Sequence, residues 1–233
     1  MLSVLHMFKS PLILALDSTE IERCAELIEQ TSEYVGVFKL GLEFFGANGP
    51  FGVANLKRRF PEISIFLDLK LHDIPNTVGK ASASLEHLKV DYLTVHAHGG
   101  SEMIKAAVLA LPETRITAVT VLTSLDENTL SSLGIEKPVE ELALRWAELA
   151  VNSGARAIVA SPLEVRALRA SLPREISLIT PGIRPNATVD DQKRTMSPKD
   201  ARAAGADFLV IGRPITGAVD VRNAARSIFE SLE

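Results

Sequence analysis

The sequence predicts a (β/α)8 barrel, an α/β fold in which parallel strands alternate with helices around a closed sheet. Short apolar runs, each followed by an amphipathic stretch, recur eight times along the 233 residues. Strands that are buried on both faces have this near-continuous apolar character. The length is common for one α/β barrel, and no Pro/Gly/Ser-rich linker divides the chain. We therefore expect a single domain over residues 1–233, with 1–10 as a short N-terminal extension, and an open doubly wound sheet as the alternative.

The expected strands and helices alternate along the whole chain. Strands are expected at 12–17, 34–41, 63–71, 92–98, 115–122, 157–161, 177–183 and 208–214. Ser18 or Thr19 is expected to cap the first helix, Pro75 to open the third, and Ser197 with Pro198 to open the seventh. The second helix is expected to contain Phe51 and Phe60. The remaining helices are expected at 101–111, 139–153, 162–171 and 216–232.

The composition is that of an ordinary globular protein. Hydrophobic residues make up 46% and charged residues 23% of the chain, and the net charge is −4. This charge gives no general attraction to nucleic acid or to an anionic membrane, so we expect neither as a partner. The N-terminal residues do not form a signal peptide, and no apolar run approaches the roughly 18 residues that span a bilayer. Cys24 is the one cysteine. We expect it to be a packing residue in a cytoplasmic protein.

Charged residues gather at the end of the third apolar run. Asp68 and Lys70 alternate along the run, so their side chains share one face if it is extended, and Asp73 follows in the turn. A salt bridge that only stabilises a strand end would explain such a pair. Three alternating charges within a few residues favour a functional site over a purely structural salt bridge.

Polar residues are also expected at the ends of nearly all the other strands. In α/β barrels the active site lies at the carboxyl ends of the strands, which therefore meet at one rim. Unpaired charges at such a rim cost several kcal/mol each to desolvate, so their accumulation indicates a charged ligand. The expected rim consists of Asp17, Lys39, Asp68 with Lys70, His96 with His98, Thr123, Ser161, the turn at 181–184, and Gly212 with Arg213.

The last two strand ends favour a phosphate ligand. Gly182 and Arg184 follow the seventh run, and Gly212 and Arg213 follow the eighth. Barrel enzymes often hold phosphate there, because glycine lets backbone N–H groups approach the anion and arginine offers a bidentate fork. The start of the final helix is expected to add a favourable dipole. The long polar loop at 184–196, which contains Gln192, is a candidate lid, with a merely flexible surface loop as the alternative.

His96 and His98 form an H-x-H pattern that is also found in metal sites. Acidic partners at a defined spacing are missing from the sequence around them. We therefore expect no metal, and the metal-dependent alternative depends on these two histidines.

Several motifs in the sequence resemble those of one enzyme family. L-D-L-K-L-H-D-I-P-N-T at 67–77 closely resembles the signature of orotidine 5′-phosphate decarboxylases. The resemblance spans the chain, since the same family pattern fits L-A-L-D ending at Asp17, F-K-L-G at 38–41, V-H-A-x-G-G at 95–100, T-V-L-T-S at 120–124, T-P-G-I-R-P at 180–185, D-Q-x-R at 191–194 and V-I-G-R-P at 210–214. The core D-x-K-x-x-D is less specific, because related barrel enzymes that decarboxylate 3-keto-gulonate phosphate share it. One departure is His98, where the family pattern has a small residue.

The resemblance implies a cofactor-independent lyase that converts orotidine 5′-monophosphate to uridine 5′-monophosphate and carbon dioxide in pyrimidine biosynthesis. It implies that Lys70 is the proton donor, that Asp68 lies beside the substrate carboxylate, and that Asp17 and Lys39 contact the ribose or complete the charge network. It also implies a homodimer in which Asp73 and Thr77 complete the partner's site. The remaining substrate-binding residues would be Ile74, Thr123, Ser124, Pro181, Arg184, Gln192, Gly212 and Arg213.

Decarboxylation at an sp² ring carbon leaves a carbanion that the ring cannot delocalise well. A fixed ammonium at that position stabilises the developing charge and carries the proton that quenches it. Two other functions stay open from the sequence. One is a metal-dependent sugar-phosphate decarboxylase, epimerase or aldolase on the same barrel, and the other is a protein that binds a nucleotide phosphate without catalysis.

Overall fold

A closed barrel of parallel strands organises the chain. The computed structural model describes residues 10–184 and 195–232. In this described part, eight parallel strands pair in chain order, and β1 pairs with β8 to close the barrel. This architecture confirms the predicted (β/α)8 fold. The strands are β1 (Leu12–Ala15), β2 (Val37–Leu40), β3 (Ser64–Leu71), β4 (Tyr92–His96), β5 (Arg115–Val119), β6 (Ala157–Val159), β7 (Ser177–Thr180) and β8 (Phe208–Ile211).

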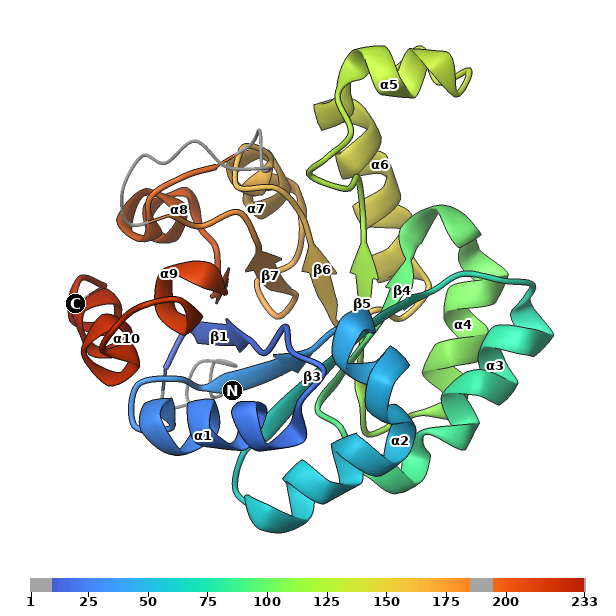
Figure 1. Ribbon diagram of the computed structural model, residues 1–233. Coiled ribbons are helices and arrows are strands. Elements are labelled where there is room, and N and C mark those ends of the chain that lie inside the picture. The colour runs from blue at the N-terminus through green and yellow to red at the C-terminus, as the bar shows by residue number, and fades with distance from the viewer. Residues whose placement is uncertain (1–9, 185–194, 233) are drawn as a thin grey trace.

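Helices surround the barrel and cover the outer face of its strands (Figure 1). The α-helices are α1 (Ile21–Thr31), α2 (Leu42–Arg59), α3 (Pro75–Ser84), α4 (Ser101–Ala110), α5 (Glu127–Ser132), α6 (Val139–Asn152), α7 (Val165–Ser171), α8 (Pro198–Ala204), α9 (Arg213–Thr216) and α10 (Val221–Glu230). Two short 3-10 helices, η2 (Glu86–Leu88) and η3 (Ala97–Gly99), flank β4. None of the helices within these described ranges has the length and apolar character that crossing a membrane requires.

The strands are apolar because each buries both of its faces. Along β1, Leu12 and Leu14 pack toward the helices, whereas Ile13 and Ala15 pack inside the barrel. Large side chains, including Phe66, Tyr92 and Phe208, fill the interior with ring contacts of about 6 Å. Burying one such aromatic side chain contributes about 1.5–3 kcal/mol. The interior of the barrel is therefore a packed core.

All the strands except β3 end earlier than the apolar runs. The first run continues to Asp17, but β1 ends at Ala15, and His98 lies in η3 and not on β4. The polar residues that follow the strands therefore stand in turns at the rim. Hydrogen-bonded pairing with the neighbouring strand, and not the apolar pattern alone, decides where a strand ends.

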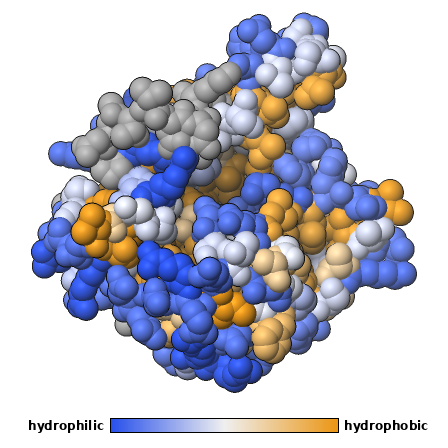
Figure 2. Space-filling view, viewed as in Figure 1, coloured by the Kyte–Doolittle hydropathy of each residue, from blue (hydrophilic) through white to orange (hydrophobic). Residues whose placement is uncertain are grey.

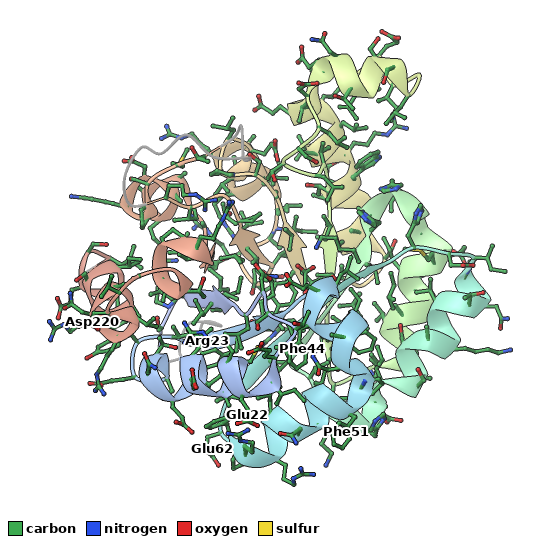
Figure 3. The ribbon with its side chains drawn as sticks, viewed as in Figure 1. Glu22, Arg23, Phe44, Phe51, Glu62 and Asp220 are labelled. Carbon is green, nitrogen blue, oxygen red and sulfur yellow. The ribbon has the colours of Figure 1, made fainter. Side chains whose placement is uncertain are left out.

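Several predicted helix limits are wrong. The first helix is not capped by Ser18 or Thr19, because Glu20 is its N-cap, while the Ser18 hydroxyl accepts from the Glu20 N–H at 3.1 Å. The second helix starts at Leu42 and bends at Gly49, whose φ of 57° interrupts it before Pro50. The two halves of α2 differ in the burial of their aromatic residues. Phe44, before the kink, is buried, whereas Phe51, after it, is 67% exposed (Figure 3). The spacing of apolar residues therefore does not predict the cap of the first helix or the kink of the second.

The end of the chain differs most from expectation. The predicted helix at 216–232 is two helices, because α9 ends at Thr216 and α10 begins at Val221. The Asp220 carboxylate accepts from the Asn223 N–H at 2.9 Å and starts the second helix (Figure 3). Gly212 consequently precedes a single helical turn. The expected helix dipole at this position is correspondingly weaker.

The long connection after β5 forms a small lobe. α5, capped by Asp126, and the start of α6 extend beyond the barrel (Figure 1). The lobe is held by its own apolar cluster of Val121, Leu130, Leu142 and Ala143. It places the residues after β5 next to the barrel mouth.

Candidate active site

A cavity of about 260 Å³ lies at the carboxyl ends of the strands. Figure 2 shows a recess on this face with hydrophobic residues at its bottom. The cavity is lined by Ala15, Asp17, Lys39, Phe66, Asp68, Lys70, Val119, Val121, Leu122, Thr123, Val159, Ala160, Ser161, Pro181, Gly182, Arg184, Val210, Gly212 and Arg213. Every strand except β4 contributes to this lining, directly or through the turn that follows it. One ligand could therefore touch most of the barrel.

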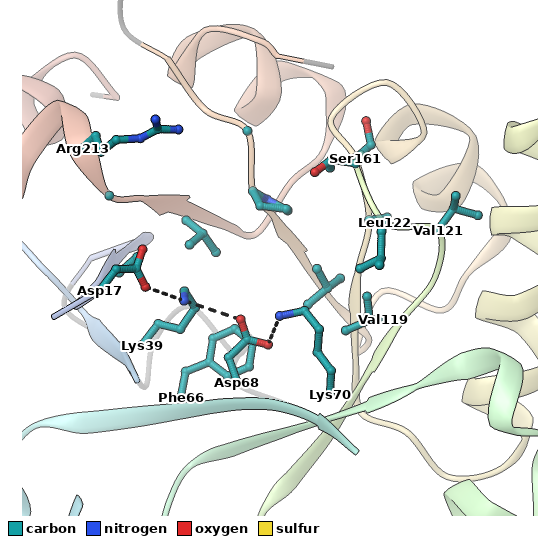
Figure 4. A pocket seen from close by; sticks show the side chains of 18 of the residues that line it. Asp17, Lys39, Phe66, Asp68, Lys70, Val119, Val121, Leu122, Ser161 and Arg213 are labelled. Carbon is teal, nitrogen blue, oxygen red and sulfur yellow. Dashed lines mark hydrogen bonds and ion pairs between the residues drawn. The ribbon is translucent and has the colours of Figure 1, made fainter. Parts of the chain in front are cut away.

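Four charged side chains form a continuous row along one wall (Figure 4). Lys39 Nζ lies 3.4 Å from Asp17 Oδ1 and 3.5 Å from Asp68 Oδ2. Lys70 Nζ lies 2.8 Å from Asp68 Oδ1. Asp17 follows β1, Lys39 is on β2, and Asp68 and Lys70 are on β3. Three neighbouring strands thus deliver alternating charges to one edge of the cavity.

The two inner groups of this row, Lys39 and Asp68, are largely removed from solvent. The exposed fractions of the Lys39 and Asp68 side chains are both 12%, whereas that of Asp17 is 56%. Burial alone would raise the pKa of Asp68, but the Lys39 and Lys70 ammonium groups, with hydrogen bonds from Lys70 and Thr94, hold this pKa below its ordinary value of 3.8. Asp68 is therefore a carboxylate at neutral pH. It separates two ammonium groups that would otherwise repel each other.

The three charges that alternate in the sequence, Asp68, Lys70 and Asp73, do not form one cluster within a single chain. Asp68, a carboxylate, lies between Lys39 and Lys70. The Asp73 carboxylate instead accepts from the Ile74 N–H at 2.6 Å. Asp73, Ile74 and Thr77 are exposed at the start of α3 and do not line the cavity of their own chain.

β3 is distorted where Lys70 sits. The register of β3 on β4 pairs Leu67 with Leu93 and next pairs Leu71 with Val95. Lys70 has a φ of 51°, in the left-handed region that residues with a Cβ rarely adopt. Asp68 and Lys70 are joined by an ion pair, although the regular alternation that predicted a common face is interrupted at Lys70. The bulge was not predicted.

The candidate phosphate ligands follow β7 and β8, and Gly212 lies next to Asp17 at one end of the charged row. Arg213 and Gly212 line the cavity at the end of β8, and Gly182 and Arg184 line it at the end of β7. The Arg213 guanidinium turns toward the cavity (Figure 4). Gly182 has a φ of 78°, which favours glycine at this turn. Arg184 and Arg213 thus follow strands that do not pair with β3, the strand that carries Lys70.

Other predicted residues have mixed outcomes. Thr123 and Pro181 line the cavity, whereas Ser124 is exposed and does not. Gln192 and most of the predicted lid lie outside the described residues. The two ends of that loop are joined, since the Arg184 N–H donates to the Met196 carbonyl at 3.0 Å.

The sequence reasoning missed the apolar part of the site. Phe66, Val119, Val121, Leu122 and Val210 form the bottom and one side of the cavity. No signal in the sequence separates them from the outward-facing residues, because both sets are equally apolar. It also missed Thr94, a polar residue in the middle of the apolar β4.

The histidines form a separate cluster beside the row of charges. The ring centroids of His72 and His98 are 4.4 Å apart, and those of His96 and His98 are 4.8 Å apart. His98 also packs on Trp146 of α6 at 5.2 Å. Within the residues that the structure describes, no three or more His, Cys, Asp or Glu side chains are placed to hold a metal ion. The rings therefore pack against one another at the edge of the site.

Cys24 matches the expectation of a packing residue. It is fully buried, and burial raises the pKa of its thiol to about 12. It lies on α1, outside the cavity lining.

A closed parallel barrel with a charged cavity at the carboxyl ends of its strands defines the class of α/β-barrel enzymes. Residues 10–228 match the family described as Orotidine 5'-phosphate decarboxylase / HUMPS. The chain belongs to this family.

Individual relatives cover nearly the whole chain. It is 47% identical to orotidine 5'-phosphate decarboxylase of Thermobifida fusca, over 96% of each chain. It is 46% identical to the protein of that name from Moorella thermoacetica, over 97% of this chain and 93% of the relative. The crystal structure of orotidine 5'-phosphate decarboxylase from Lactobacillus acidophilus superposes with a TM-score of 0.83 at 34% identity, covering 96% of this chain and 99% of that one.

Proposed function

We propose that this protein converts orotidine 5′-monophosphate to uridine 5′-monophosphate and carbon dioxide in pyrimidine biosynthesis, with Lys70 as the proton donor. Family membership supports the reaction. The single observation that carries the role of Lys70 is the row Asp17, Lys39, Asp68 and Lys70 along the cavity wall. An ammonium fixed by a buried carboxylate is preorganised to meet negative charge.

The proposed step breaks the bond between ring carbon 6 and the carboxylate carbon. The electron pair of that bond stays on carbon 6, and the carboxylate leaves as carbon dioxide. The Lys70 ammonium then gives its proton to carbon 6, and solvent returns a proton to Lys70. The reaction needs no metal or organic cofactor, because the positive charge and the proton come from one side chain.

Asp68 and Lys39 have supporting roles in this proposal. Asp68 holds Lys70 at 2.8 Å and lies beside the substrate carboxylate. Repulsion between these two carboxylates would favour loss of carbon dioxide, although we rank it below electrostatic stabilisation of the carbanion. Lys39 balances the charge of Asp68, and Asp17, which is more exposed, contacts the ribose.

The substrate phosphate is proposed to bind at the ends of β7 and β8. Arg213 and the Gly212 amide would hold it, helped by Arg184. Charge-assisted hydrogen bonds from a guanidinium are about twice as strong as neutral ones. Binding energy from this remote group can be used at the reacting carbon. Thr123, Pro181 and Gln192 remain proposed substrate ligands, as does Ser124.

We also propose a homodimer. Asp73, Ile74 and Thr77 are exposed in one chain, and Ile74 is 64% exposed. They stand at the start of α3, just beyond β3, and do not line the cavity of their own chain. A second copy would use them to complete its site.

The metal-dependent alternative gains no support from the described residues. It requires His96 and His98 as ligands, and both rings pack in a cluster with His72. We therefore propose decarboxylation and not a metal-dependent epimerisation.

The experiment that tests the proposed reaction is an ultraviolet assay of the purified protein with orotidine 5′-monophosphate. We expect the substrate absorbance to fall, the product to be uridine 5′-monophosphate, and the rate to be unchanged by a chelator. Binding of the substrate without any change in absorbance would leave only a nucleotide-binding protein. A rate that a chelator abolishes would favour the metal-dependent alternative.

A further inference from the structure

We infer that Thr94 is a positioning residue for Lys70, and that its hydroxyl group holds the bulged backbone of β3 in the geometry that aims the ammonium. This inference rests on the proposed role of Lys70. Thr94 is fully buried on β4 and does not line the cavity. It would therefore act through Lys70 and Asp68 without touching the substrate.

The Thr94 hydroxyl bridges two parts of the charged row. Its oxygen accepts from the Lys70 backbone N–H at 2.7 Å and donates to Asp68 Oδ1 at 3.0 Å. The directions of both bonds are fixed, because a backbone N–H can only donate and an ionised carboxylate can only accept. A hydroxyl group can do both at once. Valine, which has nearly the same shape, can do neither.

The irregular register between β3 and β4 explains why the Thr94 hydroxyl can reach the Lys70 N–H. Between the pairs Leu67–Leu93 and Leu71–Val95, β3 has three residues and β4 has Thr94 alone. The Lys70 N–H is thereby displaced from ordinary parallel pairing, and Thr94 supplies its acceptor. A buried N–H without an acceptor is costly. The side chain of Thr94 thus replaces a missing ladder hydrogen bond.

The same bond stabilises an uncommon backbone conformation. Lys70 has a φ of 51°, which the steric clash of a Cβ disfavours. Such strain persists only where surrounding contacts hold it. Without the hydroxyl, the peptide at Lys70 is free to relax toward an ordinary extended conformation. The Cα–Cβ bond of Lys70 would then change direction, and the ammonium group would move with it.

The bridge also fixes the rotation of the Asp68 carboxylate. Oδ1 receives both the Thr94 hydroxyl and Lys70 Nζ, and Oδ2 faces Lys39 at 3.5 Å. One hydroxyl group therefore sets the backbone of the proton donor and the orientation of its carboxylate partner. A misplacement of about 1 Å at a reacting group can cost about 100-fold in rate.

Two pairs of substitutions isolate the hydroxyl from the volume of the side chain. Thr94 and Thr94→Val have nearly equal volume, as do Thr94→Ser and Thr94→Ala, and only one member of each pair has the hydroxyl. Thr117→Val is the matched control, because Thr117 is equally buried on β5 and its hydroxyl donates to the Arg115 carbonyl away from the cavity.

The test measures kcat, KM and the affinity for uridine 5′-monophosphate of these variants in the ultraviolet assay. We expect Thr94→Val to lose about 10- to 100-fold in kcat, the range for a hydrogen bond to a charged group. We expect a similar ratio between Thr94→Ser and Thr94→Ala, with KM and product affinity changed less than about threefold. Thr117→Val should keep the wild-type kcat.

Equal kcat within about twofold in either folded pair overturns the inference. The Ser and Ala pair decides the matter if Thr94→Val does not fold. A parallel fall in kcat and product affinity, or an equal loss in Thr117→Val, would also overturn it, because those results indicate general loosening of the barrel. An inactive wild-type protein would instead contradict the proposed function.

Discussion

Asp68 is the carboxylate that pairs with both lysines of the cavity. Its two oxygens face different ammonium groups, with Lys70 at 2.8 Å and Lys39 at 3.5 Å. Removing one partner of a buried ion pair generally costs several kcal/mol, because the other charge is left uncompensated. The value of the pair in this cavity lies in the placement of Lys70 more than in the stability of the fold.

His96 is the second residue whose environment changes its chemistry. Its Nδ1 is buried and has no hydrogen-bond partner in the described ranges. Burial, followed by the positive charges of His98, His72 and Lys70, lowers the pKa of His96 to about 4, although Asp68 acts in the opposite direction. His96 is therefore neutral at physiological pH, and it adds no charge next to Lys70.

This lowered pKa predicts a pH dependence of stability. The unfolded chain takes up a proton at the ordinary histidine value of 6.5, whereas the folded protein accepts it at about 4. The stability that depends on neutral His96 is complete above pH 6.5 and is lost as the pH falls toward 4. Because the ring is partly exposed, we expect a loss of about 1–3 kcal/mol in the free energy of unfolding.

Urea denaturation at several pH values measures this loss. His96→Gln should reduce the dependence, and His87→Gln, at an exposed position, should not. An unchanged pH dependence in His96→Gln would show that other groups are responsible.

At the scale of the elements, the sequence predicted the strands well and their distortions poorly. The apolar runs begin within three residues of every strand, because burial on both faces requires continuous apolar residues. The bulge at Lys70 has no such signature, since it depends on pairing with Thr94 of another strand. The Gly49 kink and the break between α9 and α10 likewise depend on local geometry.

The first residue of α9 is the proposed phosphate ligand Arg213. We expect Arg213→Ala to raise KM about tenfold or more, as for a lost charge-assisted hydrogen bond, and to change kcat less. The affinity for uridine, which lacks the phosphate, should be unchanged. KM values and nucleotide affinities measure these effects.

Arg222→Ala is the control for the loss of an arginine near the C-terminus. Arg222 is an exposed residue of α10 that pairs with Glu33. Equal KM values for Arg213→Ala and the wild type would place the phosphate elsewhere.

At the scale of the whole molecule, the barrel brings together residues that are far apart in the chain. Asp17 and Arg213 line one cavity because the closed sheet puts β1 beside β8. The sequence predicted this convergence, because eight units imply closure. It could not identify which alternating apolar side chains form the cavity bottom, since inward and outward positions are equally apolar.

The proposed homodimer makes a prediction about mixed subunits. We expect Lys70→Ala and Asp73→Ala each to be nearly inactive alone and to regain activity after subunit exchange. In an equal mixture, half of the dimers pair the two variants, and each such dimer has one intact site, so about a quarter of the wild-type activity should return. An activity equal to the sum of the separate variants would contradict sites that are shared between subunits.

The most direct test of the central claim is the turnover of orotidine 5′-monophosphate by Lys70→Ala, measured beside its affinity for uridine 5′-monophosphate. In the proposed mechanism Lys70 supplies both the stabilising charge and the proton, so we predict a loss of at least about 1000-fold in kcat. Product affinity should remain within about tenfold, because the proposed phosphate ligands follow β7 and β8 and not β3. Turnover within about tenfold of the wild type would contradict the role of Lys70.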